Sequence, residues 1–265
     1  MQISVTSYCM HNYIENGEMD IFGYLETMKY RYRLDTADIW CSPPRGTLPT
    51  ADDDYLKKVK EGLKERGLTV VNMAIDKGCI WGDTPEETIE HYKTALAYLH
   101  AAEVLGAKTV RIDMGGRSLD MADEQYDLIV RRYKEYCKIA DSCGFYVGPE
   151  NHFGPSLSPY NMEKVYKDVN HPAYKVLLHV GRWMVDQEKG DAMVAPYVMH
   201  THFNVDGPKP HGWPLDYVVQ EMKLLIKNGY KGCIGIEAGY SLSEVEWQIA
   251  SLKRAWKRAI DTDGK

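Results

Sequence analysis

The pattern of apolar and polar residues changes its period repeatedly along the chain. Short apolar or alternating runs predict β-strands, and longer segments with apolar residues three and four positions apart predict α-helices between them. The expected strands are residues 2–8, 37–41, 68–75, 109–114, a run from 145 to the polar group at 150–152, 175–179, 197–203 and 232–237. The expected helices are residues 19–32, 51–66, 84–106, 121–142, a segment opened by Ser158-Pro159, 186–195, 215–228 and 243–260.

Residues typical of helix ends support these boundaries. Asp52–Asp54 open the second expected helix and Gly67 follows it, as capping and the helix dipole favour. The sequence Thr84-Pro85-Glu86-Glu87 combines a capping threonine, a proline suited to the first turn and a glutamate that completes a capping box. The helix boundaries therefore rest on local chemistry as well as on periodicity.

Strand and helix alternate eight times within 265 residues. Such alternation predicts a parallel sheet, and eight units predict a closed (β/α)₈ TIM barrel of the α/β class. An open, doubly wound sheet is the alternative, but Gly115-Gly116 after the fourth strand is too short for a dinucleotide-binding glycine loop. No linker, low-complexity segment or charge block divides the chain, so we expect a single domain over residues 1–265.

Composition and charge narrow the functional classes. The hydrophobic fraction of 44% and the charged fraction of 26% are ordinary for a soluble globular protein. A net charge of −6, with no run rich in Lys and Arg, argues against a nucleic-acid partner. No apolar stretch is long enough to predict a membrane span. We therefore expect a soluble protein that acts on a small molecule.

The six cysteines and the N-terminal residues bear on the cellular compartment. The cysteines are scattered without the spacing of a metal site or a disulfide framework, which favours reduced thiols in a cytosolic protein. The first residues enter the first expected strand directly, without the basic and apolar regions of a signal peptide. A cytoplasmic location is the resulting expectation.

Four expected strands end in ionisable side chains. Glu150 and His152 follow the fifth strand and share one side of it, and His179, His202 and Glu237 end the sixth, seventh and eighth strands. A carboxylate at the end of an apolar strand must be paired, hydrogen-bonded or metal-bound, because burying it alone is costly. The intervals of 29, 23 and 35 residues from Glu150 through His179 and His202 to Glu237 suit βα units. The four groups could therefore meet at the mouth of the barrel.

At this point the chain resembles the xylose isomerase-like barrel superfamily of sugar isomerases, epimerases and related lyases. That group includes ketose 3-epimerases, hydroxypyruvate isomerase, inosose dehydratase and, more distantly, endonuclease IV. The resemblance covers essentially the whole chain. Its markers are Pro149-Glu150-Asn151-His152, Asn170-His171-Pro172, His200-Thr201-His202, and Gly229-Tyr230-Lys231-Gly232 leading into Ile236-Glu237.

The resemblance implies one divalent metal ion, usually held in that superfamily by Glu, Asp, His and Glu from strands five to eight. Carried over, the ligands are Glu150, His202 and Glu237, with His179 where an aspartate is usual. Mn²⁺ is the favoured ion, and Co²⁺, Fe²⁺, Zn²⁺ or Mg²⁺ also suit such ligands. Because His179 removes a negative charge and Arg182 adds a positive one, we expect a stronger Lewis acid and no second or third metal.

Several of these residues have alternative interpretations. His152 could move a proton at neutral pH or only orient a ligand carboxylate. Glu150 could pair with Arg111, and His179 could pack in the barrel wall. Arg111 and Asp113 could bind substrate or form a salt bridge, and His200 lies one layer deeper than His202. Lys209 and His211 lie in a loop that covers the substrate or is only rigid. The aromatic candidates, which stack on a sugar ring or only pack, are Trp40, Trp81 and Tyr8.

The chemistry that the superfamily shares is removal of a proton next to a metal-polarised carbonyl of a sugar. The chain resembles the metal-binding subunits of C-glycoside deglycosidases in size and barrel type, so the preferred hypothesis is a lyase that eliminates the aglycone from a 3-oxo glycoside. His152 would be its base, with Glu150 and Glu237 also in the catalytic group. The alternatives are a ketose or aldose isomerase or epimerase, in which Glu150 and Glu237 move the proton, and a non-catalytic, metal-stabilised binding subunit. A carbohydrate substrate and either a homo-oligomer or a complex with a small second subunit are the expected partners.

Overall fold

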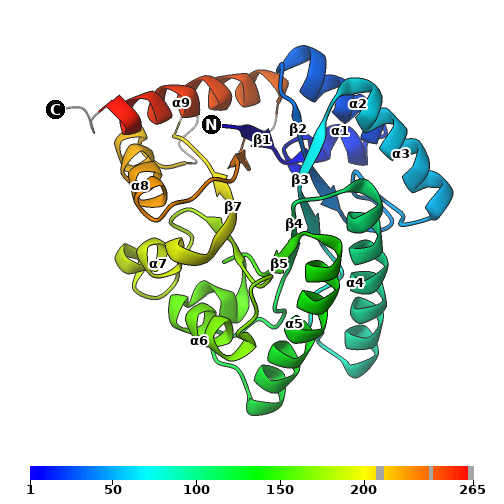
Figure 1. Ribbon diagram of the computed structural model, residues 1–265, viewed down its shortest axis with the longest axis vertical. Helices are drawn as coiled ribbons and strands as arrows, with labels where there is room; N and C mark the ends of the chain where they lie inside the picture. The colour runs from blue at the N-terminus through cyan, green and yellow to red at the C-terminus, as the bar shows by residue number, and fades with distance from the viewer. Residues whose placement is uncertain (207–211, 239–240, 262–265) are drawn as a thin grey trace.

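The computed structural model describes residues 1–206, 212–238 and 241–261. Its strands form an inner ring and its helices an outer layer (Figure 1). The strands are β1 (Ile3–Val5), β2 (Thr36–Cys41), β3 (Thr69–Ile75), β4 (Thr109–Ile112), β5 (Tyr146–Gly148), β6 (Val176–His179), β7 (Val198–Phe203) and β8 (Ile234–Ile236). The α/β alternation expected from the sequence is confirmed.

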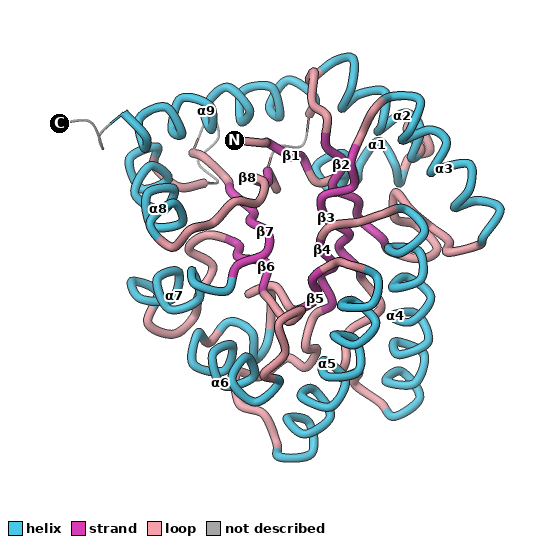
Figure 2. Tube along the Cα trace, in the orientation of Figure 1, coloured by secondary structure: helices cyan, strands magenta, loops and turns pink. Residues whose placement is uncertain are grey.

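The barrel consists of two four-stranded parallel sheets that meet at two seams (Figure 2). One sheet has the order β1-β8-β7-β6 and the other the order β2-β3-β4-β5. At the first seam Thr6 and Asp38 form an isolated parallel bridge, and at the second Glu150 bridges to Leu177. These bridges connect β1 to β2 and β5 to β6, so the strands close into the expected TIM barrel.

The helices cover the outside of the strand ring. Among the described residues they are α1 (His11–Glu15), α2 (Ile21–Glu26), α3 (Asp53–Arg66), α4 (Pro85–Leu105), α5 (Asp123–Cys143), α6 (Pro159–Val169), α7 (Gln187–Val194), α8 (Leu215–Lys227) and α9 (Leu242–Asp261). None of them is both long and apolar enough to cross a lipid bilayer.

The capping residues act much as the sequence predicts. The Asp52 side chain accepts hydrogen bonds from the amides of Asp54 and Tyr55, and Gly67 ends the helix with a φ of 60°. Thr84 accepts from the amide of Glu87 at 3.1 Å. The Glu87 carboxylate accepts from the amide of Asp83, one residue before the position that a capping box requires.

Two elements differ from the sequence-based expectation in the first quarter of the chain. The strand expected over residues 2–8 ends at Val5, because a 3₁₀ turn at Ser7–Met10 leads directly into α1. The helix expected over residues 19–32 begins at Ile21 and continues beyond α2 as a π-helical turn at Thr27–Arg31. The first change places the candidate Tyr8 in the 3₁₀ turn instead of a strand, and the four expected metal ligands lie on later strands and are not affected.

Candidate metal centre

Four strand ends bring two carboxylates and two imidazoles together. Glu150 follows β5, His179 ends β6, His202 lies in β7 and Glu237 follows β8. His179 is directly opposite His202 in the β6–β7 register. One ligand atom from each of the four side chains lies within 4.8 Å of all the others. The sequence-based expectation that these four residues meet at the barrel mouth agrees with this geometry.

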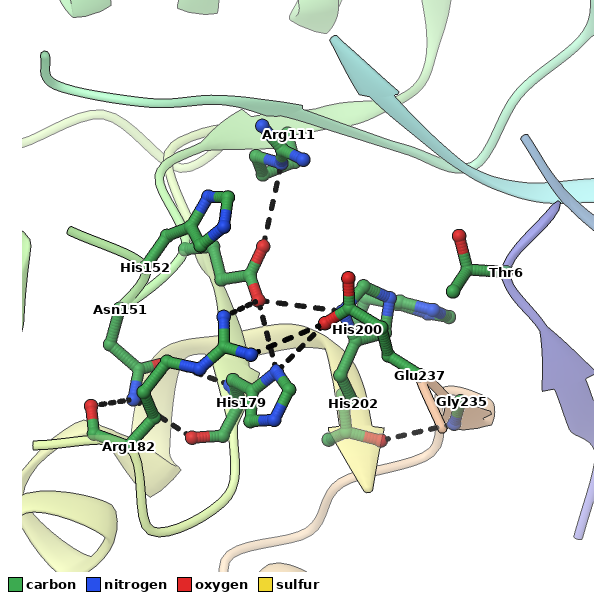
Figure 3. Close-up of polar contacts among 12 residues, drawn as sticks. Thr6, Arg111, Asn151, His152, His179, Arg182, His200, His202, Gly235 and Glu237 are labelled. Carbon is green, nitrogen blue, oxygen red and sulfur yellow. Dashed lines mark hydrogen bonds and ion pairs between the residues drawn. The ribbon is translucent and has the colours of Figure 1, made fainter. Parts of the chain in front are cut away.

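The separations between these atoms suit a shared cation (Figure 3). His179 Nδ1 lies 3.2 Å from Glu150 Oε1 and 3.0 Å from Glu237 Oε2. His202 Nδ1 lies 3.5 Å and 3.3 Å from the same two oxygens. Two ligands that are each about 2.1 Å from one ion are separated by roughly 3.0 Å at a right angle and roughly 3.4 Å at a tetrahedral angle.

Buried polar atoms without a hydrogen-bond partner give a second test of the fit. These atoms include His202 Nδ1, Glu237 Oε2 and Glu150 Oε2. Leaving buried polar atoms unsatisfied costs about 1–3 kcal/mol for each group, and more for charged ones. A divalent cation bound by two carboxylates and two imidazoles would satisfy the atoms that face the centre of the cluster. The residues present therefore fit one divalent ion.

The charges in the cluster depend on one another. Burial alone would raise the pKa of Glu150, but the charge of His152 and hydrogen bonds from His179 and His202 hold that pKa well below its usual range. Burial also acts to raise the pKa of Glu237, but the charge of His202 outweighs burial and holds that pKa well below its usual range. Burial alone would lower the pKa of His202, but Glu237 and contacts with Asp38 and Glu150 hold it well above its usual range. The surrounding carboxylates therefore favour the protonated form of His202.

Arg182 places a further positive charge beside the cluster. Its guanidinium lies 3.5 Å from Glu150 Oε1 and 3.7 Å from Glu237 Oε2, and about a third of the side chain is exposed. Its loop is fixed on both sides: Asn151 Nδ2 donates to its carbonyl at 2.8 Å, and the amide of Gly181 donates to Asp191 at 3.0 Å. The guanidinium is thus presented from a rigid backbone to the space above the two carboxylates.

Asn151 also fixes the backbone of His179. Its Nδ2 donates to the carbonyl of His179 at 2.8 Å, and its Oδ1 accepts from the amide of His179 at 2.7 Å. The Asn151 side chain is completely buried. The end of β6 is therefore attached to the segment after β5 through a side chain that the sequence analysis gave no role.

His152 belongs to a network of ionisable side chains that adjoins the cluster at Glu150. Its Nδ1 lies 2.9 Å from Asp113 Oδ2, and the same oxygen accepts from Arg111 at 2.7 Å. Arg111 also contacts Asp76 at 3.0 Å and Glu150 Oε2 at 3.5 Å. The expected salt bridge of Arg111 with Asp113 and its pairing with Glu150 are therefore both present. Direct contact of Arg111 or Asp113 with a substrate stays a prediction.

The other expected contacts lie at the edge of this network or outside the described residues. Trp40 is buried against Tyr8, with ring centroids 5.2 Å apart, and its indole N–H donates to Asp76 at 2.6 Å. His200 is buried and bonded to Asp38 at 2.7 Å, in agreement with its expected deeper position. His211 and Lys209 lie outside the described residues. Asp38 itself is the second residue that the sequence analysis missed, although a carboxylate within an apolar strand is a usable signal.

Comparison with known proteins places this geometry in a family. The sequence model of the xylose isomerase-like TIM barrel matches residues 34–261, which is most of the chain. The chain belongs to this family. No curated protein sequence gives a match.

Solved structures of similar fold cover nearly the whole chain. A xylose isomerase-like TIM barrel protein from Mycobacterium smegmatis in complex with magnesium is 17% identical, with a TM-score of 0.73, over 97% of each chain. A 3-keto-D-glucoside 4-epimerase from E. coli is 14% identical, with a TM-score of 0.72, over 96% of this chain and 99% of that one. A probable 3-DHS dehydratase from Bacillus anthracis is 14% identical, with a TM-score of 0.70, over 96% and 98%. At these identities the likeness establishes the shared fold.

Proposed function

We propose that this family member is a divalent-metal-dependent enzyme that removes a proton next to the carbonyl of a keto sugar or an oxidised glycoside. The observation that carries the proposal is the arrangement of four ligand-type side chains within 4.8 Å of one another, beside a histidine that is oriented by its own carboxylate. Similarity in fold to a keto-glucoside epimerase and to a dehydratase supports the same kind of substrate.

In this proposal Glu150, His179, His202 and Glu237 hold the ion, and Mn²⁺ is the ion that we favour. When bound, a divalent ion supplies a Lewis acid that polarises the substrate carbonyl. The two carboxylates would just balance the charge of a doubly charged ion, and Arg182 adds one further positive charge beside them. Arg182 would bind the substrate oxygen on which negative charge develops.

His152 is the proposed base. A carboxylate only accepts hydrogen bonds, so Asp113 fixes the His152 tautomer with its proton on Nδ1 and leaves Nε2 free to take a proton. Burial acts to lower the pKa of His152, but Glu150 and Asp113 outweigh it and raise that pKa. A base that is separate from the ligand carboxylates can act while both glutamates remain engaged.

The preferred reaction is elimination. His152 would take the proton from the carbon next to the carbonyl, and the electron pair of that C–H bond would form a carbon–carbon double bond as the aglycone leaves the β-carbon of a 3-oxo glycoside. The departing aglycone takes up one proton from solvent and His152 returns the proton that it accepted to solvent, so atoms and charge balance. A candidate base other than the two ligand glutamates, oriented by Asp113, favours elimination.

Isomerisation or epimerisation is the second candidate. The carboxylates of Glu150 and Glu237 both face the same two imidazoles, so they could remove and return a proton on two sides of a substrate between them. The similarity in fold to a keto-glucoside 4-epimerase supports this candidate.

One experiment separates these outcomes. The purified protein is supplied with Mn²⁺ in D₂O and given a 3-keto glucoside or a free ketose. Release of the aglycone would support elimination, and deuterium retained in an intact sugar would support isomerisation or epimerisation. If neither occurs, and if Glu237→Gln lowers only the thermal stability, the catalytic proposal fails and the non-catalytic alternative takes its place.

A further inference from the structure

Asp38 lies within β2, completely buried, at the first seam of the barrel. Its Oδ2 accepts hydrogen bonds from His200 Nε2 at 2.7 Å and from Ser4 Oγ at 3.2 Å, and its Oδ1 accepts from Asn72 Nδ2 at 2.9 Å. The same Oδ2 lies 3.6 Å from Nε2 of His202. An apolar side chain would fill this position without the cost of burying a charge, so the carboxylate points to a role beyond packing.

The cluster of Asp38, His200 and His202 could be considered a metal site in its own right. The separation of 2.7 Å between Asp38 and His200 is a hydrogen-bond length, and it is shorter than the roughly 3 Å between two ligands of one ion. Ser4 and Asn72 occupy further acceptor positions on the carboxylate. The cluster is therefore a hydrogen-bonded network, in contrast to the group at the barrel mouth.

His202 connects this network to the candidate metal centre. Its Nδ1 faces Glu150 and Glu237 at 3.5 Å and 3.3 Å, while its Nε2 faces Asp38. A nearby carboxylate stabilises a proton on the nitrogen that faces it, even where the contact is too long for a hydrogen bond and acts through charge. With an ion between the two glutamates, the lone pair of Nδ1 would be directed at the ion, and the remaining ring proton would be on Nε2, where it faces Asp38.

Packing keeps the two imidazoles in this orientation. Gly235 of β8 lies so close that a Cβ at its position would be 2.9 Å from His200 Nε2 and 3.1 Å from His202 Cδ2. The rings of His200 and His202 are nearly perpendicular, with centroids 5.6 Å apart. Neighbouring backbone thus restricts rotation of the His202 ring and keeps Nε2 on the side of Asp38.

We propose that Asp38 is a positioning residue for the metal centre: from inside the barrel it fixes the tautomer of His202, so that this histidine binds the ion through Nδ1. The inference rests on the proposed function, because it requires that His202 is a metal ligand. It adds a residue from β2 to a centre whose ligands come from β5 to β8.

The test compares substitutions of two buried residues, Asp38 in β2 and Tyr24 of α2, which contacts the same strand. Asp38→Asn keeps the shape of the side chain and removes its charge, and we expect Mn²⁺ affinity, measured by titration calorimetry, to fall roughly 10- to 100-fold. The matched control is Tyr24→Phe, because the Tyr24 hydroxyl bonds to the Asp38 backbone at 2.8 Å and 3.0 Å without touching the carboxylate. This control should lower stability and leave Mn²⁺ affinity unchanged.

A measurement on the unmodified protein keeps the inference testable if Asp38→Asn does not fold. With ¹⁵N-labelled histidine and Zn²⁺ bound, NMR should show the proton of His202 on Nε2 and the metal on Nδ1. The opposite assignment, or unchanged Mn²⁺ affinity in a folded Asp38→Asn protein, would overturn the role of Asp38. Failure of the metal centre itself is distinguishable, because Glu237→Gln would then also leave Mn²⁺ affinity unchanged.

Discussion

Asn151 offers a direct test of how the candidate metal centre is held. Asn151→Leu retains a side chain of similar size and removes three buried hydrogen bonds, two with the backbone of His179 and one with the carbonyl of Arg182. A net contribution of about 1 kcal/mol for each bond gives a loss of about 3 kcal/mol in the free energy of unfolding. Because these bonds position His179, we expect Mn²⁺ affinity to fall at least tenfold as well.

The assay has two parts and a matched control. Urea denaturation in the presence of a chelator measures stability, and calorimetric titration measures Mn²⁺ binding. Asn161 is the control residue, since its Nδ2 also joins two loop carbonyls, those of Leu119 and Pro155, at 2.8 Å and 3.0 Å. Asn161→Leu should cost about 2 kcal/mol and leave Mn²⁺ affinity unchanged. If Asn151→Leu also affects only stability, Asn151 does not position the ligand.

Three further predictions concern proton transfer and pH. His152→Asn should slow exchange of the substrate proton roughly 10²- to 10⁴-fold with Mn²⁺ affinity retained, and undiminished exchange would exclude His152 as the base. Mn²⁺ affinity should rise with pH in calorimetric titrations, because the ion must displace the proton that the raised pKa keeps on His202; a flat profile would contradict this. Glu221 lies in α8, and burial together with the charge of Asp191 raises its pKa from 4.5 to about 8. As the pH rises, the unfolded chain loses the Glu221 proton before the folded protein does, so the free energy of unfolding should fall from about pH 4.5 to pH 8. Urea denaturation should show a smaller fall in Glu221→Gln, and an unchanged fall would refute the assignment.

Much of the barrel can be predicted from the sequence, because its signals are local. Asp52, Thr84 and Gly67 mark helix ends through contacts with residues only a few positions away. The meeting of the four candidate ligands was also predictable, since parallel strands in a barrel bring their carboxyl ends to one face. Periodicity alone was enough to expect that Glu150 and Glu237 lie near each other.

Other features depend on contacts between distant segments. The bond between Asp38 and His200 joins residues 162 positions apart, and a pattern along the chain contains no information on that pairing. The hydrogen bonds from Asn151 to the backbone of His179 and Arg182 cannot be predicted from the sequence for the same reason. The early end of β1 at Val5 was missed because residues up to Tyr8 have strand-like composition, while Thr6 accepts from the amide of Tyr8 and starts a 3₁₀ turn.

The two seams of the barrel have a mechanical consequence. The sheet that contains β6, β7 and β8 supplies His179, His202 and Glu237, and the opposite sheet supplies Glu150. An ion held by all four would join the two sheets at the barrel mouth, in addition to the isolated bridges and to the hydrogen bonds that Asp38 and Asn151 make across the seams. Chelation should therefore speed amide hydrogen exchange first along the edges next to Thr6 and Leu177, before the interior of either sheet responds.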